Sequence, residues 1–124
     1  MERLYRMVQG YRKRFPKGVE PFQMVARLLE ECGEVASEVN LWEDTGIKRQ
    51  KHGEPKKEHL AGEIRQAMAA LAQIAVYYHV EEELDTSIEA SLARMQQEGY
   101  LDEPSQQKAR TEKINHEENP AKHI

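Results

Sequence analysis

Cysteine is almost absent from this sequence, and so are long apolar runs. The single cysteine, Cys32, has no partner in the chain for a disulfide or a thiolate metal site, which indicates a reducing compartment. No run approaches the roughly 18 consecutive apolar residues of a membrane-spanning helix, and the first residues lack the apolar core of a signal peptide. We therefore expect a cytoplasmic protein that does not bind a membrane.

Large aromatic residues are also scarce, with two phenylalanines, one tryptophan and five tyrosines in 124 residues. Such a composition suits helices that share apolar faces better than a thick sandwich core. Strand-like alternation is missing, as is the glycine-rich turn of a P-loop or dinucleotide fold. No glutamate precedes a histidine by three residues, which excludes the spacing of a di-iron bundle. These absences favour an all-α fold.

Charge is distributed in blocks along the chain. Residues 1–17 hold six basic and one acidic residue, 18–44 one and seven, 45–57 five and one, and 58–124 six and thirteen. A nucleic-acid binder more often has one dominant basic face, so this balance argues against nucleic acid as a partner. It indicates an acidic centre beside a basic loop.

Apolar spacing predicts four main helices in one domain, residues 1–103. The first carries an apolar stripe over residues 4–15, the second runs from Pro21 to about Trp42, the third spans about 56–84, and the fourth starts near Asp85 and stops at Gly99. Thr86 and Glu89 resemble a capping box for the fourth helix. Residues 43–55 read as a loop, and residues 104–124 as a polar tail that is mobile or a loosely docked helix.

Acidic residues border the apolar stripes of the second and third helices. At about 100° per residue, Arg27, Glu34 and Glu38 fall within roughly 60° of Glu31, and Glu63 has a similar position on the third helix. The stripe of the second helix is Val25, Leu28, Cys32, Val35 and Val39, and that of the third is Leu60, Ile64, Ala67, Leu71, Ile74, Ala75 and Tyr78. Antiparallel packing through the stripes would bring Glu31, Glu34 and Glu63 to one point, where they would repel unless Mg²⁺ or Mn²⁺ bridged them. Acidic rows on helices are otherwise often solvent faces, so both interpretations stay open here.

The segments LEECGEV (29–35) and LAGEIRQ (60–66) carry a family resemblance. The first is similar to the EExGE helix motif of MazG-like all-α nucleoside triphosphate pyrophosphohydrolases, and the second to their ExxD motif. The resemblance covers roughly residues 4–98. It implies a four-helix bundle-like MazG fold that assembles as a homodimer or homotetramer. It also implies Mg²⁺-dependent hydrolysis of a nucleoside triphosphate to the monophosphate and pyrophosphate.

Carried across residue by residue, the resemblance implies that Glu31, Glu34 and Glu63 are metal ligands. It places Glu30 at the edge of the site, as a group that orients the ligands or the attacking water. Where the family motif ends in Asp, this chain has Gln66, whose amide oxygen can ligate a cation but brings no negative charge. His59, one turn before Glu63, would favour Mn²⁺ if it were a ligand, although a solvated or capping histidine is the more frequent case.

Two further groups are candidate substrate contacts. The basic loop could neutralise charge on the leaving pyrophosphate or simply be solvated, and its residues are Lys48, Arg49, Lys51, Lys56 and Lys57. Trp42 could stack on a nucleobase, but a lone tryptophan at a helix edge is more often core.

Two other functions remain open from the sequence. Gln66 motivates a catalytically weak or inactive MazG-like module that binds nucleotides or partners. The same fold and chemistry on another substrate, such as phosphoribosyl-ATP, is the other possibility.

Overall fold

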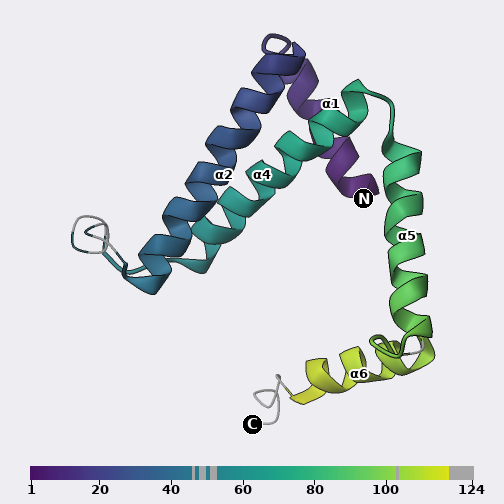
Figure 1. The fold of residues 1–124 in the computed structure, drawn as a ribbon. Coiled ribbons are helices and arrows are strands. Elements are labelled where there is room, and N and C mark those ends of the chain that lie inside the picture. The colour runs from purple at the N-terminus through teal and green to yellow at the C-terminus, as the bar shows by residue number, and fades with distance from the viewer. Residues whose placement is uncertain (46, 48–49, 51–52, 103, 118–124) are drawn as a thin grey trace. The chain divides into compact units, whose positions relative to one another are not determined.

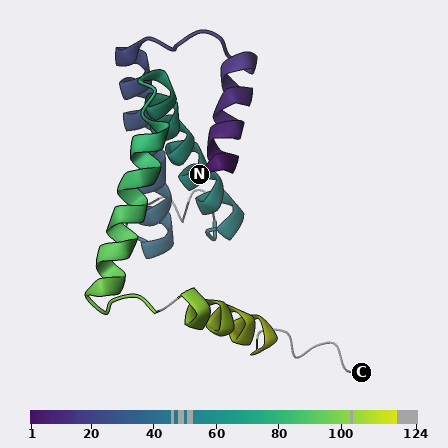
Figure 2. The ribbon, with the colours of Figure 1, turned by 90° about the vertical axis from the view of Figure 1, so that its right-hand side faces the viewer.

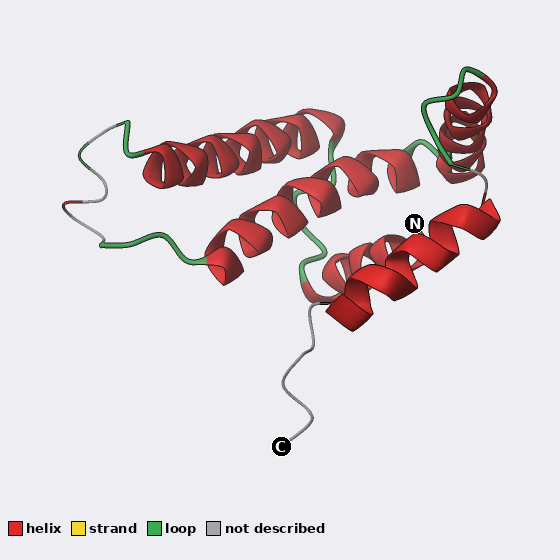
Figure 3. Cartoon of the chain, turned by 90° about the horizontal axis from the view of Figure 1, so that it is seen from below, coloured by secondary structure: helices red, strands yellow, loops and turns green. Residues whose placement is uncertain are grey.

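The chain is all-α in its computed structural model, which describes residues 1–45, 47, 50, 53–102 and 104–117 (Figure 1). The side chains of residues 104–107, 116 and 117 are not part of the description. The helices are α1 (Glu2–Arg14), α2 (Pro21–Glu43), α4 (Lys57–Tyr77), α5 (Glu81–Gln97) and α6 (Pro104–Glu117). Figure 3 shows helices and loops over the described residues and no strand. The predicted all-α class is confirmed.

Two compact units make up the chain, Met1–Glu82 and Glu83–Ile124. The first contains α1, α2 and α4, and the second contains most of α5 together with α6. The predicted domain of residues 1–103 with a separate tail stays a prediction, as does the bundle of four main helices. Within the described residues, no helix is long and apolar enough to cross a bilayer.

In the first unit, α4 packs against both α1 and α2. Figure 2 shows α4 between the other two helices, and Figure 1 shows that α2 and α4 run antiparallel. Val8 of α1 is buried against Ala69 and Ala72 of α4. The alanine side chains allow these two helices to approach closely. Hydrophobic residues that are fully buried in the described chain are few and mostly small: Val8, Met24, Ala69, Ala70, Ala72 and Ala75.

Local signals position most helix ends as expected. α1 ends before Pro16, α2 begins at Pro21, and α5 ends before Gly99, which has φ of +82°. Proline is tolerated at the first helical position and glycine adopts positive φ at low cost, so these residues mark helix ends. At the start of α2, the N–H of Glu20 donates to Oε1 of Gln23 at 3.3 Å.

The junction between α4 and α5 differs from the sequence prediction. α4 ends at Tyr77 rather than near residue 84, and α5 begins at Glu81, so Thr86 and Glu89 lie inside α5 and form no capping box. His79 has φ of +55°, its N–H donates to the Val76 carbonyl, and the Val80 N–H donates to the Ala75 carbonyl. This is the Schellman pattern with histidine at the left-handed position. Neither glycine nor proline marks the break, so the sequence did not reveal it.

Replacing His79 by glycine should stabilise the first unit. A side chain in the left-handed region costs about 1 kcal/mol that glycine avoids, so His79→Gly should raise the free energy of unfolding by about that amount. Urea unfolding followed by circular dichroism measures the change. Arg65→Gly, at an exposed position inside α4, is the control and should lower it by about 1 kcal/mol. A decrease in His79→Gly would show that the imidazole makes a stabilising interaction.

The apolar stripes of α2 and α4 are only in part the packing faces that their spacing predicted. Val25 and Val39 of α2 are 47% and 45% exposed, and Leu71 of α4 is 55% exposed. Other members of the same stripes turn inward: Leu28 and Val35 of α2 are half-buried, and Ala75 of α4 is buried. Each stripe is therefore only partly covered in the single chain.

In the second unit, α5 ends in another Schellman turn, where the Tyr100 N–H donates to the Met95 carbonyl and the Gly99 N–H to that of Gln96. The predicted stripe of Ile88, Leu92 and Met95 lies on α5 and is exposed. Residues 104–117 form α6. An exposed ion pair joins Arg110 Nη1 to Asp102 Oδ2 at 3.5 Å.

Candidate functional site

Glu31 lies at the electrostatic centre of the predicted site. It is half-buried on α2, and burial raises the pKa of its carboxyl. The nearby carboxylates of Glu30, Glu63 and Glu34 raise the pKa further, and only Arg27 opposes them. A carboxylate that is desolvated and surrounded by like charges favours a proton or a cation beside it. Either would offset the repulsion at Glu31.

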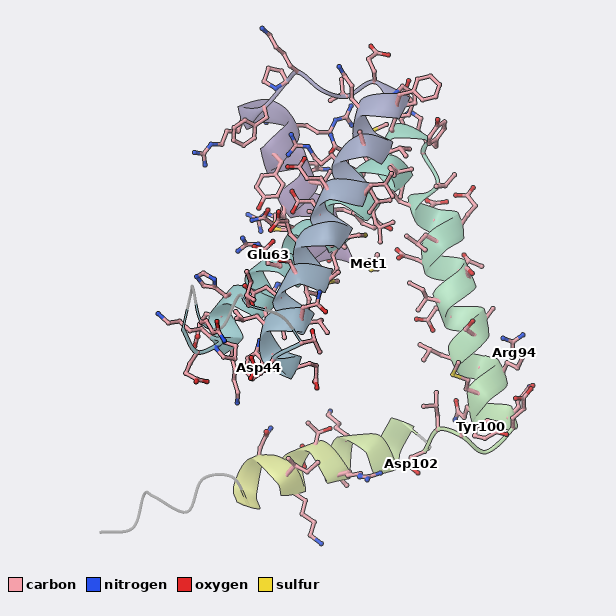
Figure 4. All side chains as sticks on the ribbon, turned by 60° about the vertical axis from the view of Figure 1, so that its left-hand side comes forward. Met1, Asp44, Glu63, Arg94, Tyr100 and Asp102 are labelled. Atoms are coloured by element: carbon pink, nitrogen blue, oxygen red, sulfur yellow. The ribbon has the colours of Figure 1, made fainter. Side chains whose placement is uncertain are left out.

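Glu63 reaches this centre from another helix. It is half-buried on α4, which packs against α2, and Figure 4 labels it there. Its charge contributes to the raised pKa of Glu31, so the two residues lie on helices that pack together and within electrostatic range of each other. Glu30 and Glu34 are exposed on α2.

The side chains of this site suit a metal ion by their chemistry better than by their arrangement. All-oxygen ligands suit Mg²⁺ or Mn²⁺, and the charge at Glu31 favours a cation. Over the residues described, however, no three histidine, cysteine or acidic side chains are close enough to hold one ion together. The meeting of Glu31, Glu34 and Glu63 around one ion stays a prediction.

A cleft of about 230 Å³ opens between α1 and α2 and has α4 as its floor. We call it the aromatic cleft, because two rings of the α1 segment line it. Glu31 and Gln66 also line it, so a predicted ligand and the residue that replaces the family's Asp share this space. Its lining residues are Val8, Tyr11, Phe15, Lys17, Gly18, Arg27, Glu31, Gln66, Ala69, Ala70 and Gln73.

A second cavity, of about 380 Å³, lies along the C-terminal half of α2. We call it the acidic cavity, and Glu34, Ser37, Glu38, Leu41, Glu54, Lys56 and His59 line it. The Glu38 side chain is only 15% exposed, and its Oε1 lies 3.8 Å from Nδ1 of His59. Its Oε2 is buried without a hydrogen-bond partner among the described residues. Glu31 and Glu34 therefore face different cavities.

The residues predicted to contact substrate also lie in different places. Lys56 lines the acidic cavity with Glu34, whereas Lys57 is exposed and lines neither cavity. Trp42 is half-buried and also lines neither. The predictions for Lys48, Arg49 and Lys51 concern positions outside the described residues.

Several residues of the two cavities were not candidates from the sequence. Tyr11 and Phe15 were read as parts of an apolar stripe, and Gln73 had no distinguishing neighbour in sequence. Arg27 and Glu38 were placed on the acidic row of the second helix without a role. The signal that was available is the position of Arg27, one turn before Glu31. The cleft itself depends on three helices, which local spacing does not place.

Comparisons with known proteins do not assign this chain to a family. No protein-family model, no curated protein and no solved structure matches it. The resemblance to MazG-like enzymes thus stays a prediction from the two sequence motifs.

Proposed function

We infer that this protein is a metal-dependent nucleotide pyrophosphohydrolase that converts a nucleoside triphosphate to the monophosphate and pyrophosphate. The observation that carries the inference is the position of Glu31. Its carboxylate is crowded by Glu63 from the second motif, and it lines a cleft that also contains Lys17 and Arg27. A site for a metal-bound polyphosphate needs both features, acidic ligands for the ion and cations for the phosphates.

Residues of both motifs would have different roles in the reaction. Glu31 and Glu63 would hold Mg²⁺, or Mn²⁺, with the Gln66 amide oxygen as a neutral donor at the edge. Glu34 lines the other cavity, so its side chain would have to turn toward Glu31 to become a third ligand. The bound ion would supply charge neutralisation and activation of water. Glu30, adjacent to Glu31 on α2, would accept a hydrogen bond from the attacking water. Lys17 and Arg27 would orient the phosphates, while Lys56 and the remaining basic loop residues would balance charge on the departing pyrophosphate.

A second copy of the chain is the partner that fits the exposed apolar rows. On α2 the row is Phe22, Val25, Leu29, Cys32, Ala36 and Val39, and on α4 it is Ala61, Ile64, Met68, Leu71, Ala75 and Tyr78. Both rows advance by alternating steps of three and four residues, which is the spacing of a helix-packing seam. We call them the seam rows. Except for Ala75, all of these residues are exposed.

The small core supports the same conclusion. Four of the six fully buried hydrophobic residues of the described chain are alanines, so the first unit buries little apolar volume by itself. Small helical units of this kind gain stability by association. Two copies related by a two-fold axis would pack α2 and α4 against the same pair and form a four-helix bundle. We infer a homodimer, or a homotetramer built from it, in the cytoplasm.

The activity is tested with a panel of nucleoside triphosphates and purified protein in Mg²⁺ or Mn²⁺. Phosphoribosyl-ATP belongs in the panel because it would use the same chemistry. Release of pyrophosphate that requires the divalent ion and stops with a chelator is the expected result. Absence of pyrophosphate release with every substrate and both ions would contradict the enzyme.

A weak or inactive module that binds nucleotides is the second candidate, and Gln66 favours it because the site lacks one formal charge. Gln66→Asp separates the two candidates. For an enzyme, the added carboxylate should leave kcat unchanged or raise it and should tighten Mg²⁺ binding, since anionic oxygen is the better ligand. Steady-state kinetics and titration of the metal measure both effects. Gln66→Glu is the control, because it adds the same charge on a side chain longer than the family's Asp. A fall of kcat in Gln66→Asp would mean that the amide has a specific role.

A further inference from the structure

An ion pair joins α2 to α4 close to the two sequence motifs. Glu38 of α2 places its Oε1 3.8 Å from Nδ1 of His59, which lies in the first turn of α4. The side chain of Glu38 is 15% exposed and that of His59 is 72% exposed. Both residues line the acidic cavity. Neither belongs to a motif, and the function inferred above gives them no role.

Stability alone does not explain a glutamate at position 38. Oε2 of Glu38 is buried and has no hydrogen-bond partner among the described residues. A carboxylate oxygen in this state has lost its hydration without replacement, which costs free energy. His59 offsets only part of the cost, because its side chain is mostly exposed and the contact is longer than a hydrogen bond. An apolar side chain would be the more stable choice here.

The sequence distances from this pair to the acidic residues of the motifs are the same on both helices. Glu34 precedes Glu38 by four residues on α2, and Glu63 follows His59 by four residues on α4. The two helices run antiparallel (Figure 1). Four residues span about 6 Å of helix, so contact between Glu38 and His59 puts Glu34 and Glu63 on one level along the helix axes.

The aromatic cleft agrees with this register of the two helices. Glu31 precedes Glu38 by seven residues, and Gln66 follows His59 by seven. Two turns from the pair, Glu31 and Gln66 therefore share a level, and both line the cleft. A slip of α4 by one turn would move the second motif by about 6 Å relative to the first. Metal–ligand distances tolerate only about 0.2 Å, so a slip would break up a site that uses both motifs.

Apolar packing specifies this register only weakly. Of the described residues that are fully buried, only Val8 and Met24 are larger than alanine, and Val8 packs between α1 and α4. Small side chains form shallow ridges, so one helix can slide along another with a modest loss of contact. A charged pair in such an interface favours one alignment, because any other leaves its members unpaired, and it does so at a cost in stability.

We propose that Glu38 and His59 are positioning residues that set the register of α2 against α4. In this register Glu63 lies at the height of the first motif, where it can share a metal ion with Glu31. The pair touches neither the ion nor the substrate. The proposal rests on the metal site inferred above, but the register can be measured without metal or substrate.

Spin labels measure the register directly. The labels are attached to cysteines at two exposed positions, Ala26→Cys on α2 and Glu58→Cys on α4, with Cys32→Ser to remove the native thiol. Labelled protein is mixed with an excess of unlabelled protein, so that pulsed electron paramagnetic resonance records distances within one chain. In the leucine pair, Glu38→Leu with His59→Leu, the distance should shift by about 6 Å or split into two that differ by this amount.

Two further variants are the controls for the leucine pair. Glu43→Leu with Arg65→Leu removes one charge of each sign from exposed positions of the same helices outside both cavities, and should leave the distance unchanged. His59→Lys keeps a cation that can reach Glu38, and should also keep the distance. Urea unfolding in chelator should find the leucine pair at least as stable as the wild type, because apolar side chains replace an imperfectly paired charge.

Metal binding is the second readout, followed through the resonance signal of free Mn²⁺. The leucine pair should bind Mn²⁺ about tenfold or more weakly, since loss of groups that orient metal ligands has an effect of this size. His59→Lys should bind Mn²⁺ as the wild type does. Weaker binding by His59→Lys with an unchanged spin distance would show that His59 is itself a ligand, and would overturn the proposal.

An unchanged spin distance in the leucine pair would overturn the proposal, as would a less stable leucine pair with unchanged Mn²⁺ affinity, since the pair would then only stabilise the fold. A shifted distance in a protein whose wild type binds no Mn²⁺ would overturn the metal site and leave the register role standing. Binding of Mn²⁺ by the wild type with no shift in the leucine pair would do the reverse.

Discussion

Glu31→Gln should lower the rate of pyrophosphate release by about 100-fold or more and at the same time stabilise the free protein. The loss in rate is expected because the amide cannot replace a negatively charged ligand at the centre of the site. The gain in stability follows from the position of Glu31, where burial and the charges of Glu30 and Glu63 disfavour a carboxylate. A gain in stability with a loss of activity is typical of a residue kept for function.

The pH dependence of this effect has a definite sign. The pKa of Glu31 is raised above 4.5 in the folded state, so the folded protein binds this proton more tightly than the unfolded chain. The stability contributed by the protonated carboxyl is complete below 4.5 and is lost as pH rises through the folded-state pKa. The advantage of Glu31→Gln over the wild type should therefore grow as pH rises above 4.5 and then level off.

Urea unfolding across this pH range in chelator measures the advantage. Mg²⁺ should raise the melting temperature of the wild type and have little effect on Glu31→Gln, because a ligand that binds only the folded state stabilises it. Glu82→Gln removes the same charge from an exposed position and should leave activity and its metal dependence unchanged. A variant Glu31→Gln that is less stable than the wild type in chelator, or fully active, would contradict the role given to Glu31.

Leu29→Arg should convert the proposed dimer into monomers. Leu29 is 68% exposed in the single chain and lies in the middle of the α2 seam row. In the dimer, the substitution would replace a buried leucine, worth about 1.5–3 kcal/mol, by a charge with no partner. The dissociation constant should rise by about 100-fold or more, since each 1.4 kcal/mol is a factor of ten.

Sedimentation equilibrium over a range of concentrations measures this change. Gln9→Arg adds the same charge to an exposed position on α1 outside the seam rows, and should leave the assembly intact. The monomeric variant should also unfold at lower temperature, because its two seam rows lose their cover. A wild type that remains monomeric at high concentration, or a dimeric Leu29→Arg, would mean that something else covers these rows.

Local sequence accounts for much of the fold. Apolar spacing predicted α1, α2, α4 and α5, although it missed the break between the last two. Proline or glycine marked the end of α1, the start of α2 and the end of α5. It also placed Glu31 and Glu63 beside apolar stripes, and the charge of Glu63 helps to raise the pKa of Glu31. These features depend on the helical turn and on backbone preferences, which neighbouring residues express directly.

Three-dimensional packing decided the rest. Nothing local shows that His79 would adopt a left-handed conformation and separate α4 from α5. Nor does spacing show which part of a wide apolar stripe turns inward, and here Leu28 and Val35 do so while Val25 and Val39 stay exposed.

The aromatic cleft is the clearest case of this dependence on packing. Phe15, Glu31 and Gln73 come from three segments far apart in the chain, and each looks ordinary in its own helix. Residue types and helical period determine which side chains lie on each face of a helix, because both act within a few residues. The packing of α1, α2 and α4 decides which of these side chains face one another, and this packing depends on contacts between distant residues.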